Sequence, residues 1–420
     1  MTSEHEPNRA FVWVWLPGAT EPVVAGLVQT VGTAVVFNYG ASYLQRSDAI
    51  ALYSPELPLK PGRIRPLEGL RMAGCINDSG PDAWGQRVIM HRRFGHKSRT
   101  TDPGDVSPIT YLLESGSERI GALDFQGSAD NYEARSASAT LEEMMQAAER
   151  LEAGEPFSAT LDNALLHGSS IGGARPKVLL DDDGRKLIAK LSSRHDPYPV
   201  VKAEAVAMEL ARRVGLDVAA TELIECLGHD VLLVERFDRT PNPGERRMIV
   251  SALTLLQLDE MMARYATYYD LADIVRRRFT EPKKTLRELF SRIVFNICVG
   301  NTDDHARNHA AFWDGSHLTL TPAYDLCPQT RSGGQAAQAM AIGRDGFRWS
   351  QLDGCISAAS VYLLTQGEAR EIIDRQLAVI TAEWTGAADA VRLTGAERRQ
   401  LWGRQILNPY ALEGYRAVGF

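Results

Sequence analysis

The densest group of chemically active side chains is residues 301–308, Asn-Thr-Asp-Asp-His-Ala-Arg-Asn, which directly follow an apolar run over residues 293–299. A carboxylate such as Asp303 can accept the proton of a hydroxyl group, and an amide oxygen such as that of Asn308 can help to hold Mg²⁺. These two residues are five apart, as are the base and the metal-binding amide of the protein-kinase catalytic loop. The spacing therefore favours phosphoryl transfer.

A second carboxylate follows farther along the chain. Residues 318–325 read Leu-Thr-Leu-Thr-Pro-Ala-Tyr-Asp, so Asp325 comes just after a predicted strand. This position suits the other Mg²⁺ ligand, the role of the aspartate in the Asp-Phe-Gly motif of kinases. The chain reads Asp-Leu-Cys here, so that motif itself is absent.

Upstream, a glycine-rich stretch precedes a predicted strand hairpin with an Asp-Gly turn of type I′ at residues 181–184. Residues 169–177 read Ser-Ser-Ile-Gly-Gly-Ala-Arg-Pro-Lys, and small residues let backbone N–H groups approach phosphate oxygens. The spacing of a Walker A loop is missing. Lys190 on the returning strand could contact nucleotide phosphates, and Glu204 on the next predicted helix could orient it. Alternatively, the glycines only form a turn and both charges are solvated.

Two other interpretations use the same downstream residues. His305 and His309 are four apart, which on a helix would place both imidazoles on one face. With Asp303 or Asp304 they could form the divalent-metal site of a hydrolase, although the glutamate of a His-Glu-x-x-His motif is missing. In the other interpretation, these polar residues only cap helices and turns. The kinase-type spacing accounts for more of the pattern than either.

The elements that must position these residues change in kind along the chain. The first hundred residues are rich in strand formers, and a polar stretch over residues 131–139 marks a boundary. Thr140 and Glu143 then form the sequence pattern of a capping box. After Pro241 the chain is mainly helical. We predict strands over residues 11–16, 33–39, 49–53, 177–180, 186–191, 231–234 and 317–321, and helices over residues 82–93, 203–214 and 286–299, the last ended by Gly300.

The composition limits the class of protein. The 420 residues are 44% hydrophobic and 24% charged, as in globular proteins, and their number suits two to four domains. No apolar run reaches the roughly 18 residues that a membrane span needs, and the first residues do not resemble a secretion signal. The five cysteines include no Cys-x-x-Cys pair, so we expect neither a disulfide framework nor a cysteine zinc site. We predict a reduced, cytoplasmic protein.

Several of these segments together resemble the HipA-like serine/threonine kinases, the toxins of bacterial toxin–antitoxin modules. The resemblance covers nearly the whole chain, and its C-terminal motifs are the more specific ones. It rests on residues 80–87, 119–125, 170–177, 188–190, 234–239, 301–308 and 320–325.

The resemblance implies an α+β, two-lobed protein-kinase-like fold. A β-rich N-terminal subdomain would span residues 1–130, and a kinase N-lobe with the phosphate loop would span residues 131–240. A mainly helical C-lobe with the catalytic and metal-binding segments would span residues 241–420.

The resemblance also implies ATP and Mg²⁺ and assigns roles to residues by motif position. Asp303 would be the catalytic base, His305 would support its loop, and Asn308 and Asp325 would hold Mg²⁺. Lys190 would contact the ATP phosphates. At the hinge, Glu235 and Phe237 would offer backbone groups to adenine, with Asp238 near the ribose. The phosphate loop would contribute Gly173, Ala174, Arg175 and Lys177.

Ser170 matches the serine that family members autophosphorylate, which silences the kinase by ejecting the phosphate loop. A phosphoserine adds about −1.5 to −2 charges, which would repel ATP phosphates from that loop. Ser169 is an adjacent candidate. The sequence departs from the family at Arg175-Pro176, where many members have a Gln-Glu type pair, and Pro176 removes one backbone donor.

The partners implied are a helix-turn-helix antitoxin of the HipB type and a protein substrate, in the family an aminoacyl-tRNA synthetase. The net charge of −7 argues against nucleic-acid binding through the overall field, although a local basic patch could still act. We therefore expect DNA contact only through the antitoxin, and no membrane partner. The alternatives are a kinase of this fold with another substrate or a mainly regulatory role, and an antitoxin-binding module with a vestigial site.

Overall fold

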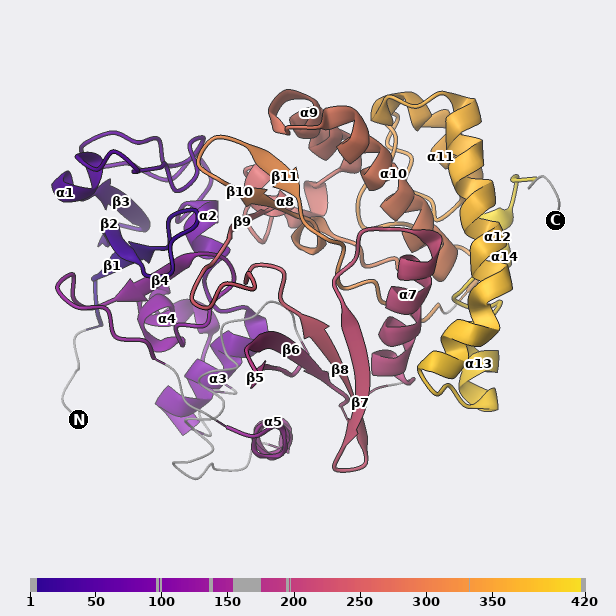
Figure 1. Ribbon diagram of the computed structural model, residues 1–420, viewed down its shortest axis with the longest axis horizontal. Helices are drawn as coiled ribbons and strands as arrows, with labels where there is room; N and C mark the ends of the chain where they lie inside the picture. The colour runs from indigo at the N-terminus through magenta and orange to yellow at the C-terminus, as the bar shows by residue number, and fades with distance from the viewer. Residues whose placement is uncertain are drawn as a thin grey trace. The chain divides into compact units, whose positions relative to one another are not determined.

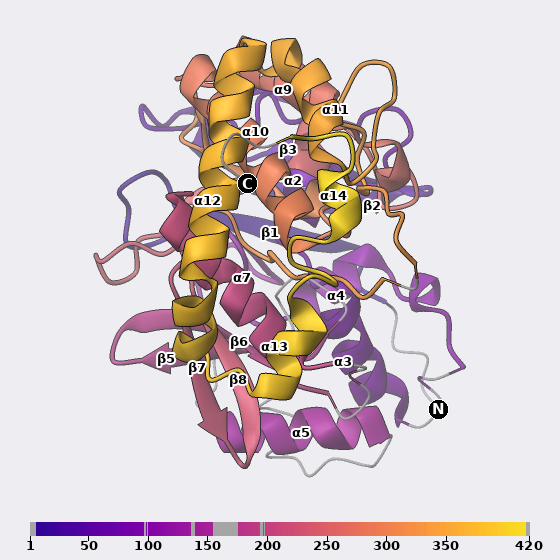
Figure 2. The same cartoon turned by 90° about the vertical axis from the view of Figure 1, so that its right-hand side faces the viewer.

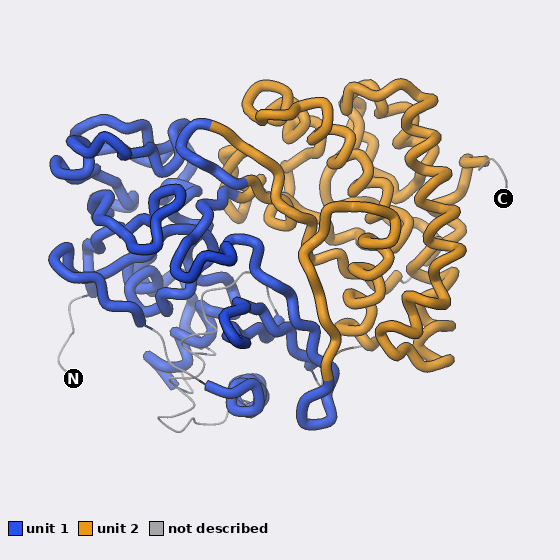
Figure 3. Tube along the Cα trace, in the orientation of Figure 1, with its two compact units in different colours: residues 1–193, 225–250, 312–316 blue, residues 194–224, 251–311, 317–420 orange. Residues whose placement is uncertain are grey.

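The structure is a computed structural model that describes residues 6–95, 98, 100–135, 139–153, 175–193, 196, 198–331 and 333–416. The chain forms two compact units (Figure 3). Unit 1 comprises Met1–Ser193, Glu225–Val250 and Phe312–Ser316, and unit 2 comprises Arg194–Ile224, Ser251–Ala311 and His317–Phe420. The division into residues 1–130, 131–240 and 241–420 stays a prediction.

Unit 1 contains an antiparallel four-stranded sheet in the order β3-β2-β1-β4 (Figure 1). Its strands are β1 (Arg9–Val14), β2 (Val23–Val31), β3 (Ala34–Tyr39) and β4 (Leu123–Gln126). The strands predicted over residues 11–16 and 33–39 overlap β1 and β3. The one predicted over residues 49–53 is wrong: Leu52 and Tyr53 are fully buried, but only an isolated bridge from Tyr53 to Leu57 forms. The apolar residues of this segment are buried in the core, but they do not pair as a strand of a sheet.

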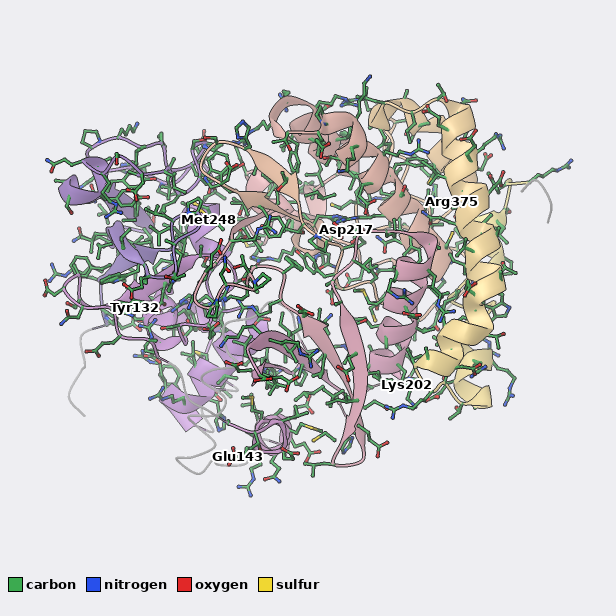
Figure 4. All side chains as sticks on the ribbon, in the orientation of Figure 1. Tyr132, Glu143, Lys202, Asp217, Met248 and Arg375 are labelled. Carbon is green, nitrogen blue, oxygen red and sulfur yellow. The ribbon has the colours of Figure 1, made fainter. Side chains whose placement is uncertain are left out.

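Aromatic side chains pack together at and just after β1. Tyr132 lies against Trp13 and Trp15, with ring centroids 5.4 and 5.3 Å apart (Figure 4). The Tyr132 hydroxyl donates to Asp124 on β4, a buried carboxylate that also accepts from Arg119 at 2.7 Å. Such a fully paired buried group holds the segments around β4 in one arrangement.

The helices of unit 1 begin at polar caps. Asp82 accepts from the Gly85 N–H at the start of α3, which confirms the helix predicted there. The capping box is also confirmed, since Thr140 and Glu143 exchange side-chain and backbone bonds of 2.9 and 3.2 Å. The helical elements are α1 (Ala41–Leu44), α2 (Gly74–Asn77), α3 (Ala83–Phe94), η2 (Pro103–Asp105), α4 (Pro108–Glu114) and α5 (Leu141–Ala153).

A second sheet of unit 1 contains the predicted hairpin. β5 (Lys177–Asp182) and β6 (Arg185–Leu191) pair antiparallel, and β8 (His229–Glu235) pairs with β6. The φ angles of Asp183 and Gly184 are both positive, 49° and 85°, as the predicted type I′ turn requires. The chain passes between the units after Ser193 and after Ser316. It also passes between them within three strands, β7 (Thr221–Cys226), β9 (Met248–Ser251) and β10 (Ala310–Trp313). The last strand, β11 (Leu318–Leu320), lies in unit 2.

Unit 2 is mainly helical. The long helix α12 packs along α7 and α10 (Figures 1 and 2), and Lys202 on α7 pairs with Glu397 on α13 at 3.5 Å (Figure 4). The predicted helices over residues 203–214 and 286–299 are α7 and α10. The helical elements are α7 (Val200–Val214), α8 (Ala252–Leu255), η3 (Ala263–Tyr265), α9 (Tyr268–Arg278), α10 (Pro282–Val299), η4 (Ala306–Asn308), α11 (Leu352–Ser357), η5 (Ala359–Tyr362), α12 (Gln366–Ala390), α13 (Gly395–Leu401) and α14 (Pro409–Leu412).

Among the described residues, no helix combines the length and the apolar character that crossing a membrane requires.

Candidate active site

The loop with the predicted base begins where α10 ends at Gly300. Gly300 has a φ of 72°, and a Cβ there would lie 2.5 Å from the backbone oxygen of Gln405. Only glycine meets both requirements, so the helix stops at this residue. The Asn301 N–H then bonds to the Asn296 carbonyl at 2.8 Å, which turns the chain into the loop.

The loop closes on itself between Asp303 and Asn308. The Asn308 Nδ2 donates to the Asp303 carbonyl at 3.3 Å, and its backbone N–H donates to the His305 carbonyl at 2.8 Å. Asn308 is buried, whereas Asp303 is exposed and therefore accessible to a substrate. The structure thus brings together the predicted base, its supporting histidine and one predicted metal ligand.

Asp304, the neighbour of the predicted base, anchors the loop. Its Oδ2 accepts from Asn296 at 2.7 Å, from the Tyr268 hydroxyl, and lies 2.9 Å from His309 Nε2. The Asn301 side-chain Nδ2 donates to the side-chain oxygen Oδ1 of Asn296 at 3.0 Å. Asp304 is only 1% exposed, so these partners replace the water that its carboxylate would otherwise bind. Asp304 and these partners, named here the Asp304 hub, therefore fix the backbone from which Asp303 projects.

Asp325 reaches the same loop from the segment after β11. A parallel bridge between Ala323 and Val218 holds this segment, and the Tyr324 hydroxyl donates to the Arg307 carbonyl at 2.7 Å. The φ of Asp325 is 60°, a left-handed conformation that is uncommon outside glycine. Backbone conformations of this kind persist where the surroundings over-determine them, and they cluster at functional sites.

The electrostatics of Asp303 indicate crowded negative charge. Partial burial of the carboxylate raises its pKa above the ordinary aspartate range, His305 opposes this rise, and Asp325 and Asp304 add to it. Two carboxylates with a repulsive interaction, together with the Asn308 amide bonded to the same loop, fit a divalent cation. Mg²⁺ is usually held by one or two carboxylates together with waters and phosphate oxygens. Asn308 and Asp325 are the residues of this chain that would hold it.

Unit 1 places two lysines opposite each other. Lys177 on β5 pairs in register with Lys190 on β6, so both side chains stand on one face of the sheet. The next pair on this face is Leu179 and Ile188, and Val234 follows on β8. Two ammonium groups on one face of a sheet suit phosphate oxygens, and the adjacent apolar residues suit a base ring.

The residues predicted to form the hinge lie in different environments. Glu235 is exposed at the end of β8, and Phe237 packs edge-on against Phe312 with centroids 5.9 Å apart. Asp238, predicted to lie near the ribose, is 2% exposed, and its carboxylate accepts from Arg236, Arg239 and the Gly121 N–H at 2.7–2.9 Å. A ribose contact would require this cluster to open, because the carboxylate is already committed.

The remaining predicted residues fall in two groups. Arg175 is half-buried at the entry to β5, and Glu204 is buried on α7 in unit 2. The predicted phosphate-loop and autophosphorylation residues Ser169, Ser170, Gly173 and Ala174 lie outside the described residues.

The arrangement expected of a hydrolase metal site does not form. Apart from the short η4, the loop is not helical, so His305 and His309 do not share a helix face, and His309 bonds to Asp304 instead. Over the described ranges, no group of three or more His, Cys, Asp or Glu side chains is placed to hold a metal.

Sequence reasoning missed the residues that hold the loop. Tyr268 and Asn296 are 36 and 8 residues from Asp304, and no short motif joins them to it. Arg307 pairs with Glu260, 47 residues away. The one available signal was Asp304 itself, a second acidic residue beside the base for which the kinase-type spacing gave no role.

Two family descriptions match this chain. The HipA-like C-terminal domain family matches residues 169–384, and the HipA N-terminal domain family matches residues 14–126. The first match includes Asp303, Asn308 and Asp325, and it covers more than half of the chain.

Individual relatives agree with these matches. A HipA serine/threonine-protein kinase toxin of Shewanella oneidensis is 28% identical over 183 residues, which are 37% of this chain and 42% of the relative. The Y4mE protein of Sinorhizobium fredii is 28% identical over 177 residues, 37% of this chain and 41% of that protein. These matches thus span about two fifths of either relative.

A solved structure shares the fold over its whole length. It is a chain of the Shewanella oneidensis complex of HipA, HipB and operator DNA, with a TM-score of 0.67 and 18% identity. The match covers 98% of this chain and 100% of that one. The α+β, two-lobed kinase-like fold is thereby confirmed.

Proposed function

Because the chain belongs to the HipA family, we propose that it is an ATP- and Mg²⁺-dependent serine/threonine protein kinase that acts as a bacterial toxin. The observation that carries this proposal is the loop of unit 2, in which an exposed Asp303 lies beside Asn308 and interacts electrostatically with Asp325. This arrangement supports Asp303 as the proposed base and Asn308 and Asp325 as the proposed Mg²⁺ ligands.

In this mechanism Asp303 accepts the proton of the substrate hydroxyl as that oxygen attacks the γ-phosphorus of ATP. Its raised pKa brings it closer to the operating pH, which makes it a better proton acceptor than an ordinary aspartate. His305 opposes this rise. The Asp304 hub holds the loop in place without touching the reactants.

Different residues would contact the phosphates, the adenine ring and the Mg²⁺ ion. Lys177 and Lys190 would bind phosphate oxygens, and the apolar face beside them would take the adenine ring. Asn308 and Asp325 would hold Mg²⁺, which supplies charge neutralisation of the phosphates when bound. Glu235 and Phe237 would offer backbone groups to adenine. Arg175, Gly173 and Ala174 would complete the phosphate loop.

The biological setting follows from the relatives. One relative is named a kinase toxin, and the structural neighbour is a complex with HipB and operator DNA. We propose a HipB-type antitoxin as partner, with DNA contacted through it, in the cytoplasm. The proposed substrate is an aminoacyl-tRNA synthetase or another translation factor. Autophosphorylation at Ser170, or at the adjacent Ser169, would switch the kinase off.

Intact-mass spectrometry after incubation with Mg²⁺ and ATP tests the activity. We expect one or more added phosphates on the wild-type chain and none on Asp303→Asn, which keeps the shape of the side chain but cannot accept the proton. Asp130→Asn, on an exposed loop of unit 1, is the matched control and should behave as the wild type. Phosphate gain by Asp303→Asn would remove the base assignment, and no gain by the wild type would remove the proposed activity.

A further inference from the structure

A short turn beside the candidate catalytic loop exposes large apolar side chains. Met261, Met262 and Tyr265, named here the apolar ridge, are 78%, 43% and 56% exposed. Eight large hydrophobic side chains are exposed among the described residues, and three of them lie within these five positions. Scattered exposed hydrophobic residues are normal, but a cluster of them marks an interaction surface.

The ridge is an ordered structure. The Asp259 carboxylate accepts the Met262 N–H at 2.8 Å, and the Tyr265 N–H bonds to the Met262 carbonyl at 2.9 Å. The buried residues Ala266 and Tyr268 follow directly. The apolar side chains are therefore held outward by a defined turn, since the backbone around them is bonded and anchored.

Two contacts fasten this turn to the candidate catalytic loop within unit 2. On one side of the ridge, Glu260 forms a two-pronged ion pair with Arg307, with Nε and Oε2 3.0 Å apart. On the other side, Tyr268 donates to Asp304, the neighbour of the proposed base. The turn that carries the ridge is thus bonded to the loop at Asp304, next to Asp303, and at Arg307.

We propose that the apolar ridge binds the protein substrate of this kinase, by packing against aliphatic or aromatic side chains that flank the target serine or threonine. This inference rests on the proposed function. A substrate hydroxyl bound at Asp303 is part of a polypeptide that must also run past the surface next to Asp303. The ridge forms part of that surface, because its turn is bonded to the Asp303 loop at Arg307 and Asp304. Methionine suits the role because its flexible, polarizable side chain adapts to different partners.

The substrate class follows from the same surface. The ridge offers apolar contact, while the acidic Glu260 beside it is already paired with Arg307 and the Arg264 guanidinium lies 4.9 Å from the centre of the Tyr265 ring. Recognition would therefore depend on apolar residues near the phosphorylated hydroxyl rather than on a run of charges.

A degenerate peptide library with a fixed central serine and randomised flanks, phosphorylated with labelled ATP and Mg²⁺, tests the proposal. We expect the wild type to prefer apolar residues by about fivefold at one or more flanking positions, as partial burial of one aliphatic side chain would give. The variant Met261→Ser/Met262→Ser/Tyr265→Ser should lose this preference. It should keep its autophosphorylation, measured by intact mass, because the ridge takes no part in the transfer itself.

The matched control is Leu227→Asn. Leu227 is 55% exposed in the hairpin turn between β7 and β8, and its φ of 51° suits asparagine. The control should retain the wild-type preference.

Three results would overturn the proposal. They are a wild type that phosphorylates itself but shows no apolar preference, a triple variant that keeps the preference, and a triple variant whose only change is its oligomeric state by light scattering. The last result would assign the ridge to a second copy of the chain. A wild type that phosphorylates neither itself nor the library would instead contradict the proposed function.

Discussion

Adjacent acidic residues at positions 303 and 304 have opposite environments and therefore opposite uses. Asp304 is buried and bonded to Tyr268, Asn296 and His309, so its charge is fully engaged in the fold. Asp303 remains accessible, and its pKa is raised by partial burial of the carboxylate and by two other carboxylates nearby. One residue positions the loop and the other is available for proton transfer.

The pH dependence of phosphorylation reports on Asp303. The ionised carboxylate is the active form, and the positive charge of His305 lowers its pKa. In His305→Gln that charge is missing, so the pKa of Asp303 rises further and the acidic limb of the rate profile moves to higher pH.

The measurement is the rate of phosphate gain across the acidic range for both proteins. His229→Gln, on an exposed part of β8, is the control and should leave the limb in place. A limb that stays put or moves to lower pH in His305→Gln would contradict the assigned interaction.

At the scale of elements, the N-terminal sheet depends on close approach of β2 and β3. A Cβ at Gly26 would lie 2.0 Å from the backbone oxygen of Asn38, which cannot move without breaking the strand pairing. We expect Gly26→Ala to lower the free energy of unfolding by about 3 kcal/mol. Urea denaturation followed by tryptophan fluorescence measures this, with Gly127→Ala as control because nothing lies within 4 Å of its Cβ. Equal midpoints for both variants would refute the close approach.

Within unit 1, the Asp238 cluster joins the segment after β8 to the residues that precede β4. Burial alone would raise the pKa of Asp238, but Arg236 and Arg239 hold it well below the ordinary range. A lowered carboxyl pKa stabilises the fold above the unfolded-state pKa of about 3.9, and this contribution is lost as the pH falls toward the folded-state value.

We therefore expect Asp238→Asn to be about 3 kcal/mol less stable at neutral pH, since two buried guanidinium groups lose one of their two carboxylate partners and keep only Glu118. Its stability should also depend less on pH in the acidic range. Denaturant midpoints measured from neutral to acidic pH provide the check, with Asp130→Asn as the exposed control. A variant with the wild-type acid profile would show that the cluster does not contribute to acid sensitivity.

At the scale of the whole molecule, nucleotide and metal should stabilise the chain separately. A ligand at about 100 times its dissociation constant adds about 2.7 kcal/mol to the native state. We expect ATP with Mg²⁺ to raise the melting temperature, and chelation of Mg²⁺ with EDTA to remove part of the rise. Lys190→Met should reduce the response to ATP, whereas Asp325→Ala should retain a nucleotide response that EDTA no longer changes. A wild type whose melting temperature ignores ATP would contradict the nucleotide site.

The fold could be predicted where local pattern decides it. Strong periodicity and clear stop residues gave α7, α10 and the β5–β6 hairpin with its turn. β2 was missed because Gly26 interrupts its run of strand formers, although close approach to β3 requires a glycine there. The strand predicted over residues 49–53 is wrong because a buried apolar segment forms a strand only where another strand lies beside it to pair with.

The candidate site divides in the same way. Spacing within the chain determined which residues could act as base and metal ligands, since Asp303 and Asn308 lie in one loop and Asp325 follows a recognisable strand. The tertiary structure alone decided that Asp304 is a buried anchor, that Lys177 faces Lys190, and that Asp238 is enclosed by arginines. These facts depend on strand register and on partners far away in sequence, which only burial of the folded chain brings together.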